Sequence, residues 1–425
     1  MHHFDYVNDR LHAEDVPLEE IAARVGTPFY CYSTATLTRH YQVFKEAFAG
    51  IPTLVCYAMK ANSNQAVLTT LARLGAGMDV VSEGELRRAR AAGVPADRIM
   101  FSGVGKTERE QALALDEDIL CFNVESEPEL VQLSRVASEK GKTARVSMRI
   151  NPDVDARTHA KIATGKAENK FGIPWGRAGA VYAQAAELPG IQVSGIDMHI
   201  GSQITELEPF DAAFSRLGGL IADLRGAGHV IDHVDLGGGL GIPYHDNNEP
   251  PPHPDAYAQV VRKHVEHLDC KVIFEPGRMI AGNAGILVTE VIYVKEGANK
   301  AFVIVDAAMN DLARPALYDS YHQIVPLTQR PGDHLKKNQL SSDVVGPICE
   351  SGDYFCKNRM LPKVGEGDHL ALLSAGAYGF VMASNYNTRA FPAEVLVKGN
   401  RAEVVRKRQS LKQLWASESV PKWLK

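Results

Sequence analysis

The chain has 425 residues, of which 45% are hydrophobic and 23% charged, and 46 lysines and arginines stand against 51 aspartates and glutamates, for a net charge of −5. That composition is ordinary for a globular protein and excludes collagen-like, disordered and coiled-coil chains. The length suggests two domains or one large barrel with an appendage, and the weak negative charge disfavours nucleic acid or a membrane surface as a partner.

The sequence also predicts a cytoplasmic location. Its longest apolar stretches fall far short of the ~20 residues that a membrane-spanning helix needs. The opening residues, MHHFDYVNDR, lack the basic start and apolar middle of a secretion signal. Six cysteines occur without a CxxC pair, which argues against a zinc ribbon or a disulfide framework and for reduced thiols.

From residue 53 onward, short β-branched runs alternate with segments of helical spacing. The runs begin near residues 54, 77, 99, 119, 145, 193, 233 and 271, and a further helical segment, TATLTRHYQVFKEAF, precedes the first of them. Eight strands with intervening helices in about 220 residues predict a (β/α)8 TIM barrel. A doubly wound open sheet uses the same alternation and is the structural alternative.

After Gly277 the pattern changes to strands without intervening helices, in ILVTEVIYV, KAFVIVDA, HLALLSAGA, AEVLVKG and AEVVRKR. Such a succession predicts an antiparallel β domain. Three prolines at 250–252 fall between the seventh strand and its helix, and we interpret them as a loop. The predicted fold class is therefore α/β, a barrel with a second, β-rich C-terminal domain.

Chemically capable residues stand at the ends of the predicted barrel strands, where barrel enzymes keep their active sites. All of them point to one mouth of the barrel. They are Lys60 after the first strand, Asp79 in the second, His199 and Ser202 after the sixth, Gly237, Gly238 and Gly239 after the seventh, and Glu275, Pro276, Gly277 and Arg278 after the eighth.

Lys60 follows an apolar strand, where an ammonium is costly to bury unless it is paired or reacts as an amine, for example in a Schiff base. A solvated strand end is the alternative interpretation. The triple glycine lets a backbone approach a ligand closely, and consecutive exposed amides form an anion nest. Its sequence, GGGLG, lacks the spacing of a dinucleotide fingerprint, and HExxH is absent, so we expect no metal.

Together these residues describe a pyridoxal phosphate site. The lysine binds the cofactor aldehyde, the nest and Ser202 hold the phosphate, and the flat ring of His199 lies against the cofactor. Glu275 pairs with the pyridinium nitrogen and makes the ring a strong electron sink. Such a site favours loss of a group from the substrate α-carbon.

The motifs YAMKAN, DVVSEGEL, HIGSQ, GGGLG and EPGR, in that order, resemble the fold-type III pyridoxal-phosphate decarboxylases. The resemblance implies an alanine-racemase-like barrel over residues 31–276 and a β-rich domain from residues 1–30 and 277–425. Further segments, MNDLARPALYDSYHQI, GPICESGD and SAGAYGF, are similar to the branch that converts meso-2,6-diaminopimelate to L-lysine and CO2.

The same resemblance implies a role for each matching residue. Lys60, His199 and Glu275 act on the cofactor, and Cys349 is the proton donor, supplied by the other subunit of a homodimer with shared active sites. Cofactor contacts come from Asp79, Ser202, Gly237, Gly238, Gly239, Pro276, Gly277, Arg278 and Tyr378, and substrate contacts from Arg278, Arg314, Tyr318, Glu350 and Tyr378.

The chemistry of the substrate agrees with these roles. Diaminopimelate carries an amino acid centre at each end, so recognition of the unreactive end needs an anion binder and a cation binder, here Arg314 and Glu350. The alternatives are a related decarboxylase acting on carboxynorspermidine, ornithine, arginine or a carrier-bound amino acid, and an inactive cofactor-binding homologue. Glu350 argues against ornithine, for which the resemblance implies Asp after the cysteine.

Overall fold

The structure is a computed structural model that describes residues 2–165, 169–244, 250–297, 300–333 and 335–425. The chain divides into two compact units. The barrel unit comprises Thr38–Pro243 and Asn247–Ile280, and the β-rich unit comprises Met1–Leu37, Tyr244–Asp246 and Ala281–Lys425. The domain limits at residues 31 and 276 stay a prediction.

The barrel unit contains the eight expected strands as one closed parallel ring. β13 pairs with β5 and β8 pairs with β9, which closes the sheet and excludes the open-sheet alternative. A short extra strand, β10 (Ile173–Pro174), adds to β9. The ring strands are β5 (Thr53–Ala58), β6 (Gly77–Val80), β7 (Ile99–Phe101), β8 (Cys121–Val124), β9 (Ala144–Asn151), β11 (Ile191–Asp197), β12 (His233–Asp235) and β13 (Lys271–Phe274).

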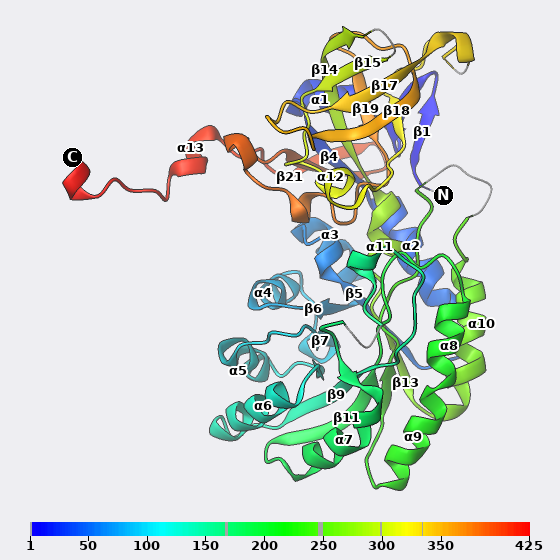
Figure 1. The fold of residues 1–425 in the computed structure, drawn as a ribbon, viewed down its shortest axis with the longest axis vertical. Coiled ribbons are helices and arrows are strands. Elements are labelled where there is room, and N and C mark those ends of the chain that lie inside the picture. The colour runs from blue at the N-terminus through cyan, green and yellow to red at the C-terminus, as the bar shows by residue number, and fades with distance from the viewer. Residues whose placement is uncertain (1, 166–168, 245–249, 298–299, 334) are drawn as a thin grey trace. The chain divides into compact units, whose positions relative to one another are not determined.

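Helices follow the strands and lie outside the ring (Figure 1). Several begin at side-chain caps that the sequence supplies, with Ser82 accepting from the Glu85 amide and Thr107 forming a capping box with Glu110. The helices are α2 (Thr34–Ala47), α3 (Gln65–Arg73), α4 (Glu83–Ala91), α5 (Glu108–Glu117), α6 (Glu127–Glu139), α7 (Ala178–Glu187), α8 (Glu208–Ser215), α9 (Leu217–Gly226) and α10 (Pro254–Val265).

The helical region between β11 and β12 consists of two helices. These are α8 and α9, which are separated at Arg216. Gly218 and Gly219 follow closely, and their low helix propensity weakens a continuous helix at this point.

The interior of the ring changes from apolar to polar along its axis. Leu54, Cys56, Met100, Cys121 and Ile273 form a buried hydrophobic cluster. Later positions on the strands, or residues directly after them, are polar and equally buried: Asp79, Asn123, Ser147, Asp197, Asp235 and Glu275. The apolar cluster therefore forms a floor, and the polar side chains gather toward the carboxyl ends of the strands.

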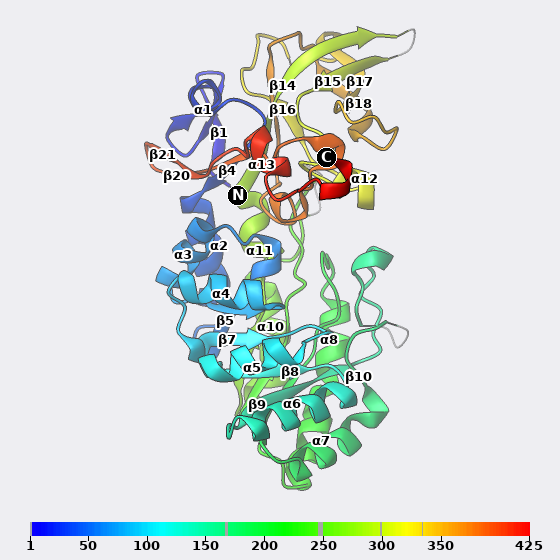
Figure 2. The same ribbon diagram turned by 90° about the vertical axis from the view of Figure 1, so that its left-hand side faces the viewer.

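The β-rich unit holds a nine-stranded sheet with strand order β18-β17-β15-β14-β4-β20-β21, while β19 pairs with β14 and β16 (Figure 2). A separate three-stranded sheet joins β1 (Phe4–Val7), β2 (Arg10–Ala13) and β3 (Val16–Pro17). The main strands are β4 (Phe29–Ser33), β14 (Gly285–Glu296), β15 (Ala301–Val305), β16 (Ile324–Pro326), β17 (Gln339–Val345), β18 (Tyr354–Pro362), β19 (His369–Leu372), β20 (Ala393–Lys398) and β21 (Arg401–Arg406).

This sheet is mixed, so the prediction of an antiparallel domain was wrong in part. β15 pairs with β17 in parallel, and β20 pairs in parallel with β4. Since β4 lies more than 350 residues before β20, no hairpin fixes its direction. Apolar residues of β4, β14 and β20, including Phe29, Ile286 and Val395, join these strands in one core.

The remaining helices are α1 (Leu18–Val25), α11 (Arg278–Ala281), α12 (Arg314–Tyr318) and α13 (Leu411–Trp415). Figure 1 shows α13 and the C-terminus lying away from the strands of the β-rich unit. Among the described residues, no helix has both the length and the apolar character to cross a membrane. The same residues contain no group of three or more His, Cys, Asp or Glu side chains arranged to hold a metal ion.

Candidate active site

Lys60 and Asp79 form an ion pair at the carboxyl ends of two neighbouring barrel strands. Lys60 lies in the single turn Met59–Ala61 after β5, and its Nζ donates to Asp79 Oδ2 at 2.7 Å. The Asp79 side chain is fully buried, whereas the Lys60 side chain is 39% exposed. A buried carboxylate requires such a cation, so Lys60 is a paired amine at the barrel mouth rather than a merely solvated strand end.

Glu275 follows β13 and is buried. Its Oε1 accepts from the Ser102 hydroxyl at 3.3 Å and from the Asn123 amide at 3.2 Å. Burial, followed by the charges of Asp235 and Asp79, raises the pKa of Glu275 well above its usual value. A cation placed beside this carboxyl would be strongly favoured, because it would stabilise the ionised form.

His199 contacts the glycine turn that follows β12. The Gly238 amide donates to His199 Nδ1 at 3.1 Å, which assigns the ring hydrogen to Nε2. Burial and the charges of Arg149 and Lys60 lower the pKa of His199 well below its usual value. His199 therefore presents a neutral, flat ring held by the backbone.

The triple glycine serves close packing inside the chain. A Cβ on Gly237 would lie 2.5 Å from His199 Nδ1, and one on Gly238 would lie 2.3 Å from the Glu275 carbonyl oxygen. The Gly237 amide donates to Asp235 Oδ1 at 2.9 Å, and the Gly238 amide to His199. The expectation of consecutive exposed amides was therefore wrong for these two glycines, because both amides already have acceptors.

The Glu275–Arg278 segment brings the end of β13 beside the end of β5. Pro276 accepts from the Ala58 amide at 3.2 Å, and a Cβ on Gly277 would lie 3.0 Å from Ala61 Cβ. Arg278 is buried, and its Nη2 donates to Ser202 Oγ at 3.2 Å. A guanidinium and a hydroxyl are a suitable pair for a phosphate.

The charge balance of the barrel mouth fits pyridoxal phosphate. Five buried carboxyl groups, those of Asp79, Glu125, Asp197, Asp235 and Glu275, gather here. Against them stand the cations Lys60, which acts on Glu275, and Arg149, which pairs with Glu125 at 3.0 Å and acts on Asp197. Asp79 Oδ1 and Asp197 Oδ1 are buried without a hydrogen-bond partner in the described chain. These carboxyls suit a further positive charge such as a protonated pyridine nitrogen, while Ser202 and Arg278 suit the phosphate.

Arg314, in the β-rich unit, is held by a histidine that sequence reasoning missed. Arg314 is only 5% exposed, and its Nη1 lies 3.1 Å from Nε2 of the buried His322. His322 Nδ1 lies 2.8 Å from the Leu373 carbonyl oxygen, so Nδ1 donates there and Nε2 accepts from Arg314. The Arg314 guanidinium also lies 4.6 Å from the ring centre of Tyr244.

Cys349 and Glu350 occupy the loop between β17 and β18, and both are exposed. The Cys349 amide donates to Asn387 Oδ1 at 2.9 Å. A hydrogen bond to Glu350 raises the pKa of the Tyr386 hydroxyl. The loop therefore presents a thiol and a carboxylate next to each other.

Asp353 fixes the start of this loop. Its carboxylate oxygens accept from the Met309 and Ile348 amides, each at 2.7 Å. A Cβ on Gly346 would lie 2.5 Å from Asp353 Oδ2. The GPICESGD motif thus contains its own anchor, because the buried aspartate ties the backbone directly before Cys349 to the rest of the unit.

Tyr318 and Tyr378 are half-buried in the β-rich unit. Tyr318 ends α12, the helix that Arg314 begins. Tyr378 has a φ of 55°, a left-handed conformation that costs a bulky residue about 1–3 kcal/mol and is typical of functional sites.

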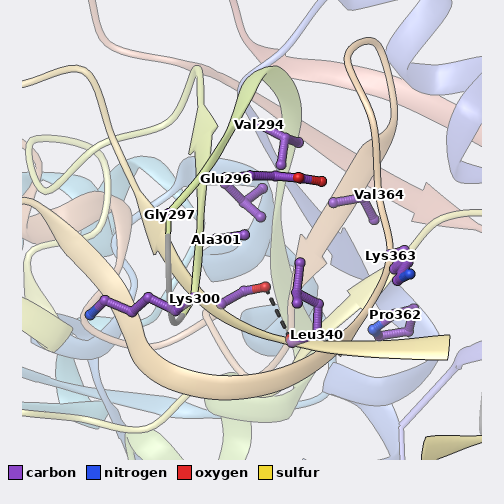
Figure 3. Close-up of a pocket in the computed structure, with 11 residues that line it drawn as sticks. Val294, Glu296, Gly297, Lys300, Ala301, Leu340, Pro362, Lys363 and Val364 are labelled. Carbon is purple, nitrogen blue, oxygen red and sulfur yellow. Dashed lines mark hydrogen bonds between the residues drawn. The ribbon is translucent and has the colours of Figure 1, made fainter. Parts of the chain in front are cut away.

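A cavity of ≈ 420 Å³ in the β-rich unit contains none of the predicted site residues. Figure 3 shows Lys300 and Lys363 on opposite sides of a group of small apolar side chains that includes Ala301 and Val364. The Lys300 ammonium already pairs with Asp343 at 2.5 Å, so we assign no function to this cavity.

Comparison with known proteins decides the family. Residues 34–282 match the family described as "Pyridoxal-dependent decarboxylase, pyridoxal binding domain". Diaminopimelate decarboxylase from Vibrio cholerae is 53% identical over 422 residues, which cover 99% of each chain. The enzyme of that name from Pseudomonas aeruginosa is 52% identical over 417 residues, covering 98% of this chain and 99% of that one. The chain belongs to the diaminopimelate decarboxylase family.

A solved structure supports the same family. Diaminopimelate decarboxylase from Helicobacter pylori, complexed with L-lysine, superimposes with a TM-score of 0.90 at 41% identity, covering 94% of this chain and 99% of that chain. The members of this family are pyridoxal-dependent decarboxylases. The predicted fold, cofactor and enzyme class are therefore confirmed.

The predicted site residues fall into two groups, one in each unit. The barrel unit brings together Lys60, Asp79, His199, Ser202, Gly237, Gly238, Gly239, Glu275, Pro276, Gly277 and Arg278. The β-rich unit carries Arg314, Tyr318, Cys349, Glu350 and Tyr378. The role of each residue, and the combination of the two groups in one active site, are proposals.

Proposed function

We propose that this chain decarboxylates meso-2,6-diaminopimelate to L-lysine and CO2 with pyridoxal phosphate as its cofactor, the last step of lysine biosynthesis. The observation that carries the proposal is the Lys60–Asp79 pair at 2.7 Å in the same barrel mouth as the buried Glu275. The full-length likeness to diaminopimelate decarboxylases supports the choice of substrate.

The barrel residues have distinct tasks. When bound, the cofactor supplies an electron sink for the electron pair left on the substrate α-carbon as CO2 departs. Lys60 binds the cofactor aldehyde, and Asp79 holds the Lys60 amine in place. Glu275 would hold the pyridine nitrogen and stabilise its positive charge. The neutral His199 ring would contact the cofactor without adding a charge of its own.

The β-rich residues select the substrate. In the proposed site, Arg314 and the hydroxyls of Tyr318 and Tyr378 bind a carboxylate together with Arg278 of the barrel unit, and Glu350 binds the distal ammonium. His322 accepts from Nη1 of Arg314 and so holds the guanidinium plane in place. The other N–H groups of Arg314 therefore keep a fixed orientation toward a bound carboxylate. A substrate without a distal carboxylate would lack the charge-assisted hydrogen bond to this buried guanidinium, which costs binding energy.

Cys349 donates the proton that replaces CO2 on the α-carbon. We propose that it does so across a homodimer in which each site takes Lys60 from one subunit and Cys349 from the other. Exposure of the Cys349 loop supports this arrangement, since the loop is open to a second chain. The reaction would take place in the cytoplasm, where thiols stay reduced.

One assay tests the substrate. The chain loaded with pyridoxal phosphate is given meso-diaminopimelate, L-lysine, L-ornithine and L-arginine separately, and CO2 release is measured. We expect release from diaminopimelate and none from L-lysine. Faster release from ornithine or arginine would contradict the proposal.

A further inference from the structure

Asn123 lies at the centre of the polar layer in the barrel, and no residue role described so far includes it. It belongs to β8 and is completely buried. Its Nδ2 lies 3.2 Å from Glu275 Oε1, 3.1 Å from Ser102 Oγ and 3.4 Å from Asp235 Oδ2. An amide NH2 has two hydrogens, so it can serve two of these three acceptors well at one time.

The direction of the Asn123 amide is fixed from its other side. The Ser147 hydroxyl on β9 donates to Asn123 Oδ1. If the amide were flipped, its oxygen would face two carboxyl groups and repel them. The hydrogen bonds therefore assign Nδ2 to the side of the carboxyl groups and Oδ1 to the side of Ser147. Asn123 is therefore held with its NH2 group facing the Glu275 and Asp235 carboxyl groups and the Ser102 hydroxyl.

Asp235 connects this amide to the glycine turn. One of its oxygens accepts from Asn123, and the other accepts from the Gly237 amide at 2.9 Å. The next amide, of Gly238, holds His199. Glu275 and His199, the two groups proposed to contact the cofactor ring, thus belong to one hydrogen-bonded network through Asn123 and Asp235.

We propose that Asn123 is a positioning residue for decarboxylation, whose amide holds the Glu275 carboxylate in the orientation and ionised form that a pyridine nitrogen requires. This inference rests on the proposed function. A neutral donor suits the position, since a hydrogen bond to the ionised form favours that form without adding a cation that would compete with the pyridinium. The charged groups facing the network are Lys60 after β5, Asp79 of β6, Glu125 after β8, Arg149 of β9, Asp197 of β11, Asp235 of β12 and, at the Asn123 carbonyl, Lys106. Arg149 pairs with Glu125 at 3.0 Å.

The first test is Asn123→Ala in the full chain, with Ser194→Ala as the matched control. Ser194 is equally buried in β11 but bonds to the Val146 carbonyl and Cys121, outside the network. Loss of the amide removes stabilisation of the Glu275 anion, so its pKa rises. We expect the acid limb of the kcat profile to move up by about one pH unit and the pyridoxal phosphate dissociation constant to rise about tenfold, the effect of one hydrogen bond to a charged group.

The dissociation constant and the pH titration of bound-cofactor absorbance are measured without substrate. They therefore test the role of Asn123 even if diaminopimelate is not the substrate. An unmoved acid limb would overturn the proposal, as would a kcat that falls equally at all pH values with an unchanged dissociation constant. If Asn123→Ala does not fold, Ser147→Ala tests the same network, because Ser147 bonds to Asn123 but not to Glu275. Ser147→Ala should move the acid limb of the kcat profile to higher pH by less than one unit, and an unmoved acid limb would overturn the proposal.

Discussion

At the scale of single residues, the Lys60–Asp79 pair explains how an amine is kept at the barrel mouth. We expect Lys60→Ala to lose the adduct that borohydride fixes between protein and pyridoxal phosphate, because no other amine is expected to occupy this position. Mass spectrometry of the reduced protein measures the adduct. Lys271→Ala is the control, since Lys271 is exposed at the opposite end of β13 and should keep it. An adduct retained at another lysine in Lys60→Ala would contradict the assignment.

Glu275 provides the second residue-scale prediction. Glu275→Gln keeps the shape of the side chain but cannot hold a pyridinium charge. The pyridoxal phosphate dissociation constant should therefore rise at least as much as in Asn123→Ala, while Lys60 and the phosphate contacts still retain the cofactor, and turnover should fall. We expect a loss of about 2–4 kcal/mol in the activation free energy, as for removal of other preorganised electrostatic groups. Steady-state kinetics and cofactor absorbance measure the two effects, with the exposed Glu187→Gln as control. Near-normal turnover would make Glu275 a structural residue.

At the scale of elements, the proposed function assigns the choice of substrate to the loop between β17 and β18. Glu350→Ala should leave the distal ammonium of the substrate without a partner and weaken transition-state binding by about 2–4 kcal/mol. Cofactor binding should not change, because the barrel residues are untouched. Measured kcat/KM for diaminopimelate tests this, and Glu366→Ala, in an exposed turn of the same unit, should leave kcat/KM intact. A wild-type kcat/KM in Glu350→Ala would exclude Glu350 from the site.

The sequence predicted the barrel because its strands read as apolar runs at regular intervals. It missed β16, β17 and β18 and also β1 to β4. A segment such as QLSSDVV in β17 is half polar and carries no clear alternation, and β4, although buried throughout, is only five residues long and precedes the repeating pattern. The parallel pairing of β4 with β20 depends on residues far apart in the chain, which a local pattern does not encode. Periodicity therefore revealed the barrel strands but only some strands of the β-rich unit.

The residues of the candidate site likewise divide into those that the sequence revealed and those that it did not. Lys60 and Glu275 could be found because they are charged residues at strand ends, where a barrel places its chemistry. Asn123 lies within the apolar run ILCFNV and reads as strand interior, although its amide contacts Glu275. His322 follows Arg314 by eight residues, a separation that suggests no contact until the backbone after α12 returns to it.

At the scale of the whole molecule, the segment Leu411–Lys425, here called the tail, supports the proposed homodimer. Its tryptophans Trp415 and Trp423 are 51% and 85% exposed. Within the described chain, the backbone hydrogen bonds of the tail join only its own residues and Ser410. Covering the exposed parts of the two tryptophans would bury roughly 200–340 Å², so two tails would supply about a third of the ~1,200–2,000 Å² of a stable interface.

Replacing both tryptophans by serine should weaken the dimer. We expect Trp415→Ser with Trp423→Ser to shift the sedimentation equilibrium toward monomer, while cofactor binding within each chain persists. The control is Tyr293→Ser, since Tyr293 is similarly exposed on β14, and it should leave the dimer intact. An unchanged dimer in the double variant would show that the tail is not part of the interface.

The proposed sharing of active sites between subunits makes the strictest prediction about the whole molecule. Lys60 lies in the barrel unit and Cys349 in the β-rich unit, and the proposal takes them from different subunits. Lys60→Ala and Cys349→Ala should each be nearly inactive, since one lacks the amine and the other the proton donor. Mixing them with subunit exchange gives heterodimers with one doubly altered site and one intact site. Because random exchange makes about half of all dimers mixed, roughly one quarter of wild-type activity should return. If Cys349 served the barrel of its own chain, verified exchange would restore nothing, and if it were only a packed thiol, Cys349→Ala would be active before mixing.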